Sequence, residues 1–184
     1  MDRKSLQVPR LYMPMGLTIV AGVVNQVFCL YAMNPPNPID CYADSHSSLL
    51  YPERQDAIPT INVTRKFHSF FWMMFTSCSF LIISNIFQVF SVVVKSEEYY
   101  DFALTMHAIN FCLFATGVIF GTQNRYSLAG KVCSGDFEQP EYLQPYVLES
   151  EGKFIRTFLV LTYMIGGTLG TWGFWRFLVF LWNR

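Results

Sequence analysis

The chain has 184 residues, of which 52% are hydrophobic and 17% aromatic, whereas only 14% are charged. In soluble domains about a quarter of the residues are charged, so this composition favours an integral membrane protein over a soluble or disordered one. The formal net charge is zero, and nothing in the balance points to a nucleic-acid partner.

Four apolar segments reach the length of about 20 residues that a helix needs to cross a bilayer. They cover residues 11–33, 67–94, 102–121 and 154–182. Basic residues precede the first segment, but its length and the lack of a small-residue cleavage site predict a retained helix instead of a signal peptide. The sequence therefore predicts an all-α, integral membrane four-helix (tetraspan) bundle that forms one domain over residues 1–184.

An even number of spans places both termini on one side of the membrane and the loops 34–66 and 122–153 together on the other. Residues 95–101 form a short connection, which predicts a tight antiparallel hairpin of the second and third spans. The basic residues Arg3, Lys4 and Arg10 favour cytoplasmic termini. We therefore expect two ordered loops on the lumenal or extracellular face.

The first loop contains five prolines, which predict an extended path with turns instead of a helix. Near its end lies Asn62-Val63-Thr64, an N-glycosylation sequon, so Asn62 is a candidate glycosylation site. Asp44 and His46 lie close in sequence, but no second cluster of metal ligands accompanies them. We predict neither a metal nor a cofactor.

Five cysteines divide between the spans and the loops. Cys29, Cys78 and Cys112 fall inside spans, where a cysteine behaves as a small apolar residue. Cys41 and Cys133 are the two loop cysteines, and both lie on the same face. In an oxidising compartment they predict one disulfide that ties the two loops together.

The stretch YSLAGKVCSGDF, residues 126–137, resembles a reactive loop because a cysteine lies among glycines, a lysine and an aspartate. It does not follow the GxxxxGK[ST] order of a phosphate loop, and no base accompanies Cys133 in sequence. Gly130 and Gly135 are expected to allow turns of positive φ, and Asp136 to accept backbone donors. We expect a structural role and no catalytic residue.

Polar side chains occur at matching depths in the second and third spans. Asn85 is expected opposite Asn110, and Gln88 opposite His107. Asn85 and Gln88 are three residues apart, as are His107 and Asn110, so the two polar residues of each helix can share one face. The favoured interpretation is an interhelical hydrogen-bond ladder. The alternative is a proton or ion path, because an intramembrane histidine is often functional.

The fourth apolar segment carries a small-residue motif and aromatic residues. Gly166 and Gly170 form a GxxxG pattern, which permits close helix packing. Arg176 is expected to reach the membrane interface or a lipid headgroup. Tryptophans at three positions suit the interfacial belt: Trp172, Trp175 and Trp182.

The predicted topology resembles that of tetraspanins, claudins and MARVEL-domain proteins, which are four-span proteins with two loops on one face. The chain lacks the CCG triplet of tetraspanins and the W…GLW…C…C pattern of claudins. No family is assigned, and no functional residue is carried over.

Three functions are compatible with these features. The favoured one is a non-catalytic accessory or scaffolding subunit of a larger membrane protein complex, in the plasma membrane or an endomembrane. One alternative is a pore-forming or transport subunit with a polar path near Gln88, His107 and Asn110. The other is a mitochondrial inner-membrane accessory subunit of a respiratory or ATP-synthase complex. The expected partners are other integral membrane subunits and lipids, with a homo-oligomer as a further option and no nucleic acid.

Overall fold

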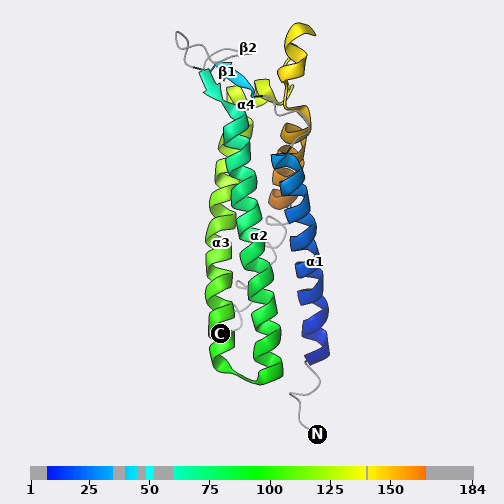
Figure 1. Cartoon of the computed structure of the whole chain (residues 1–184), viewed down its shortest axis with the longest axis vertical. Helices are drawn as coiled ribbons and strands as arrows, with labels where there is room; N and C mark the ends of the chain where they lie inside the picture. The colour runs from blue at the N-terminus through cyan, green and yellow to red at the C-terminus, as the bar shows by residue number, and fades with distance from the viewer. Residues whose placement is uncertain (1–7, 35–39, 45–48, 52–59, 140, 165–184) are drawn as a thin grey trace, which may run out of the picture. The chain divides into compact units, whose positions relative to one another are not determined.

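The computed structural model describes residues 8–34, 40–44, 49–51, 60–139 and 141–164 (Figure 1). The chain divides into two compact units, each described separately below. We call the described part of Met1–Asp40 and Thr64–Phe120 the helical unit. We call the described part of Cys41–Val63 and Gly121–Arg184 the disulfide unit.

Three long helices make up the helical unit: α1 (Val8–Met33), α2 (Val63–Val94) and α3 (Glu97–Tyr126), of which α3 ends in the disulfide unit. Only Lys95 and Ser96 separate α2 from α3, and Lys95 adopts a positive φ of 55°. Glu97 and Glu98 occupy the first turn of α3, where carboxylates interact favourably with the helix dipole. The predicted tight hairpin is present.

Each of these helices is long and apolar enough to cross a membrane: Gly16–Met33, Val63–Val94 and Glu97–Tyr126. The three helices correspond to the first three predicted spans and indicate a membrane protein. The third helix is longer than the predicted 102–121, because polar residues extend it at both ends. Residues 149–164 are helical, but 165–182 lie outside the described residues, so the fourth span and the tetraspan bundle remain predictions.

The described chain is mostly helical, as predicted, but the first loop contributes a small antiparallel sheet to the disulfide unit, which corrects the all-α prediction in this detail. The strands are β1 (Tyr42–Asp44), β2 (Leu50–Tyr51) and β3 (Thr60–Asn62), in the order β2-β1-β3. Ala43 pairs with Leu50 on one side and with Ile61 on the other. The prolines predicted an extended path, and parts of it form strands because the backbone of β1 pairs with β2 on one edge and with β3 on the other.

The second loop adds a short helix, α4 (Leu128–Cys133), and a 3₁₀ helix, η1 (Glu141–Tyr146). Ser127 caps α4, since its side chain accepts a hydrogen bond of 3.1 Å from the Gly130 N–H. A Cβ on Gly130 would lie 1.8 Å from the Asn124 carbonyl oxygen, so Gly130 permits a close approach instead of the predicted positive φ. Gly135 does have a positive φ, of 74°.

Candidate functional site

Polar side chains of the helical unit form hydrogen bonds between α1 and α2. Gln26 Nε2 donates to Ser79 Oγ over 2.6 Å, and Thr18 Oγ1 donates to Asn85 Oδ1 over 3.2 Å. A third contact of this kind joins Asn25 Nδ2 to Cys78 Sγ at 3.0 Å. These three polar residues of α1 are therefore paired with α2.

A second series of polar contacts joins α2 and α3. Ser77 Oγ donates to Asn110 Oδ1 over 2.6 Å, and Ser84 Oγ lies 3.2 Å from His107 Nδ1. His107 Nε2 lies 3.5 Å from Gln88 Oε1, so the structure brings this expected pair together. We refer to the polar contacts of α2 with α1 and α3 together as the polar seam.

The expected contact between Asn85 and Asn110 is wrong. Asn85 bonds to Thr18 of α1, whereas Asn110 bonds to Ser77 of α2. Successive residues of a helix point about 100° apart, so Ser84 faces α3 while its neighbour Asn85 faces α1. The prediction compared the depths of the residues in the membrane and left this rotation out. It also missed Ser77 and Ser84, which bond to Asn110 and His107.

The polar seam contains hydroxyl, amide, thiol and imidazole groups and no charged carboxylate or ammonium group. Residues 67–94 and 102–120 include no Asp, Glu, Lys or Arg. Interhelical hydrogen bonds of this kind contribute on the order of 1 kcal/mol each to helix association. The chemistry of the polar seam suits helix pairing.

The disulfide unit contains the predicted bond between Cys41 and Cys133. The two Cα atoms are 6.0 Å apart, and the residues are separated by 92 positions in sequence. Both cysteines are fully buried. Because Cys41 precedes β1 and Cys133 ends α4, the bond fastens the sheet of the first loop to the helix of the second.

Arg125, in the last turn of α3, is a buried cation of the disulfide unit. Its Nη1 and Nη2 each donate a hydrogen bond of 2.8 Å to the Asp136 carboxylate, and its Nε donates to the Gly152 carbonyl over 2.9 Å. The hydrogen bonds from Arg125 hold the pKa of Asp136 below its usual range. One side chain thus links α3, the turn after α4 and the helix at 149–164.

Sequence reasoning missed this pair, because it interpreted Asp136 as an acceptor of backbone donors in the turn. Arg125 and Asp136 are eleven residues apart, with no periodic relation that would suggest contact. A partial signal was present, since an arginine at the end of an apolar helix needs a partner when it is buried.

Ser134 and Gly152 pack against each other beneath this ion pair. A Cβ on Gly152 would lie 2.2 Å from Ser134 Oγ and 2.9 Å from its Cα. Ser134 Oγ is buried and finds no hydrogen-bond partner within the described residues. The close approach brings the Gly152 carbonyl within reach of Arg125.

Asn62 of the predicted sequon is the last residue of β3 and pairs with Tyr42 of β1. It is half-buried, and α2 begins at the next residue. Its glycosylation stays a prediction. The other predicted contact residues lie outside the described part of the chain: Gly166, Gly170, Trp172, Trp175, Arg176 and Trp182.

Comparison with known proteins adds no family to this picture. No protein-family model, no curated protein and no solved structure matches the chain.

Proposed function

We propose that this chain is a non-catalytic tetraspan membrane protein that acts as an accessory or scaffolding subunit of a larger membrane protein complex. The observation that carries the proposal is the polar seam, in which amide and hydroxyl groups of α1, α2 and α3 are paired between neighbouring helices. Groups engaged in this way hold helices together. They are not presented to a substrate.

The outer faces of the described helices support the same proposal. Val20, Val27 and Tyr31 of α1 are 60%, 61% and 73% exposed within the chain, so large apolar side chains point outward. In a membrane such faces contact lipid or the helices of another subunit, whose packing depends on shape and not on charge. The disulfide unit supplies a second, covalently fastened surface.

The proposal is tested by isolating the tagged chain from its native membrane in a mild detergent. We expect one or more integral membrane proteins to accompany it in constant proportion after size-exclusion chromatography. Replacing Val20 and Val27 by serine should reduce this association, whereas Cys112→Ser, an exposed change on α3, should leave it intact. A chain that purifies alone as a uniform monomer would contradict the proposal.

A pore-forming or transport subunit is a second candidate, favoured by one specific observation. His107 contacts both Ser84 and Gln88, so an ionisable ring joins two other polar groups between α2 and α3. The variant His107→Ala separates the candidates. Loss of conductance in reconstituted vesicles with normal assembly supports the pore, and loss of assembly alone supports the scaffold.

We further propose that the disulfide unit faces an oxidising compartment, which suits the plasma membrane or an endomembrane with cytoplasmic termini. The mitochondrial inner membrane is the alternative. A glycosidase-sensitive mobility shift that is absent from Asn62→Gln would support the first location. Recovery of the chain with mitochondrial membranes, without such a shift, would support the second.

A further inference from the structure

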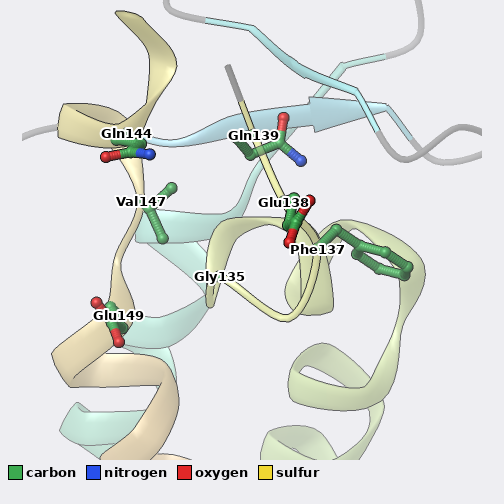
Figure 2. Close-up of a pocket in the computed structure, with 7 residues that line it drawn as sticks. All are labelled: Gly135, Phe137, Glu138, Gln139, Gln144, Val147 and Glu149. Atoms are coloured by element: carbon green, nitrogen blue, oxygen red, sulfur yellow. The ribbon is translucent and has the colours of Figure 1, made fainter. Parts of the chain in front are cut away.

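An open groove of about 580 Å³ lies on the disulfide unit (Figure 2). Glu138 and Gln139, from the turn after α4, line it on one side. Gln144, Val147 and Glu149, from η1 and the segment after it, line it on the other. The positive-φ turn at Gly135 approaches Val147 closely, since a Cβ on Gly135 would lie 3.1 Å from Val147 Cγ1.

Some polar side chains at this groove are bonded to other protein groups, and others are not. Asp136 is bound by Arg125, and the Glu149 carboxylate accepts a hydrogen bond from Lys153. Within the described residues, neither the Glu138 carboxylate nor the Gln144 side-chain amide forms a hydrogen bond or ion pair to another protein group. One carboxylate and one amide are therefore presented to solvent across the groove.

The residues that line the groove include two carboxylates, Glu138 and Glu149, and no lysine or arginine. Lys153 offsets the charge of Glu149, and Arg125 that of the neighbouring Asp136, so Glu138 is the lining carboxylate that no ion pair of the described residues offsets. An exposed carboxylate of this kind attracts cations. Among the described residues, no three His, Cys, Asp or Glu side chains lie close enough to hold a metal ion. The lining thus suits an organic cation with an apolar stem, which Val147 can contact.

We propose that this groove binds a lysine or arginine side chain on a loop of a partner membrane protein. The cationic group meets the Glu138 carboxylate, the Gln144 amide oxygen accepts a further hydrogen bond, and the aliphatic stem lies on Val147. The proposal rests on the scaffolding function above and specifies the chemistry of the partner on this face.

The full-length chain in a neutral detergent is titrated with a fluorescein-labelled hexaarginine peptide at low ionic strength, and binding is followed by fluorescence anisotropy. We expect Glu138→Gln to weaken binding about threefold to fivefold, which matches the loss of an exposed charge pair. Gln144→Ala should weaken it about threefold, through the loss of one hydrogen bond. Glu141→Gln is the matched control: it removes the same charge from an exposed residue that does not line the groove, and less than a twofold change is expected.

Equal weakening by Glu138→Gln and Glu141→Gln would overturn the proposal, because it would mean general attraction to an acidic surface. No binding of hexaarginine to the wild-type chain would overturn it as well. Unchanged non-reducing gel mobility shows that each variant keeps its disulfide unit. Groove-specific peptide binding by a chain that purifies without any other subunit would contradict the scaffolding function but not the cation-binding groove. If Glu138→Gln changes neither the complex with other subunits nor peptide binding, the proposed role of the groove is contradicted and the scaffolding function is not.

Discussion

Arg125 and Asp136 are joined by two parallel hydrogen bonds of 2.8 Å, with the arginine side chain 1% exposed and the aspartate side chain 29% exposed. The buried partner depends on the accessible one: without the carboxylate, a guanidinium group would remain in the interior with the Gly152 carbonyl 2.9 Å from Nε and the Tyr126 ring centroid 5.9 Å from Cζ, and with no counter-charge bonded to it. This asymmetry decides which substitution of the pair is the more harmful.

Asp136→Asn is expected to destabilise the disulfide unit by about 2 kcal/mol, because it leaves the buried Arg125 charge uncompensated while solvent reaches the aspartate side of the pair. The measurement is tryptic cleavage after Lys131 in the detergent-solubilised chain, which should become faster as the unit opens more often. Arg125→Met with Asp136→Leu should recover much of the resistance, since two apolar side chains of similar size replace the pair. Glu141→Gln, an exposed change nearby, serves as the control, and a cleavage rate in Asp136→Asn equal to that of the control would refute the expectation.

The same pair predicts how stability depends on pH. Because the folded-state pKa of Asp136 is lowered by Arg125, its contribution is complete above the unfolded pKa near 4. That contribution is lost as the pH falls through the folded pKa. Thermal unfolding of the wild type and of Asp136→Asn should therefore differ by a constant amount between pH 5 and 7. The difference should shrink below about pH 4. A difference that grows on acidification has the wrong sign for this mechanism.

The disulfide predicts a separate loss. Cys41→Ser and Cys133→Ser should each lower stability by up to about 4 kcal/mol, as expected for a bond that closes a long loop. The double variant should be no worse than either single one, because each change removes the same bond. Non-reducing gel mobility should shift in all three variants and remain unchanged in Cys112→Ser. Normal wild-type mobility combined with alkylation of both loop thiols would show that the bond is absent in the native protein.

The sequence predicted the features that depend on composition and counting. Three spans, the tight hairpin at Lys95 and Ser96 and the bond between Cys41 and Cys133 all follow from apolar length, helix geometry or the number of loop cysteines. The prediction that placed Asn85 opposite Asn110 used depth and ignored rotation, which depends on which helix lies on each side.

The sheet and the Arg125–Asp136 pair required information that no local pattern contains. β1, β2 and β3 have only three, two and three residues, too few for an alternating pattern to be recognised. Their pairing depends on segments brought together by the chain fold, as does the encounter of Arg125 with Asp136. Such contacts are set by tertiary structure, and a single sequence does not display them.

The polar seam predicts modest and local effects. Asn110→Leu should weaken the pairing of α2 and α3 by about 1 kcal/mol, since it removes the acceptor of the Ser77 hydroxyl. A double-mutant cycle with Ser77→Ala should return a coupling energy of about 0.5–1.5 kcal/mol. Thr116→Val is the matched control, because its hydroxyl bonds to the Cys112 carbonyl of its own helix. The measurement is the thermal unfolding of the detergent-solubilised chain, and a coupling near zero would show that the contact does not hold these helices together.

Gly152→Ala gives the most specific test of the packing beneath the ion pair. The added Cβ would meet the side chain and backbone of Ser134 and push the Gly152 carbonyl away from Arg125. We expect a loss of about 2 kcal/mol, typical of overpacking at a tight contact. Ser134→Ala alone should be neutral or slightly stabilising, because it removes a buried hydroxyl that finds no partner among the described residues. Ser134→Gly should partly rescue Gly152→Ala, since the nearest obstructing atoms are removed while the Cα at 2.9 Å remains. Tryptic cleavage after Lys131 compares the wild type, the three single variants and the double variant on one scale. Additive effects of Ser134→Gly and Gly152→Ala would show that these residues do not share the contact.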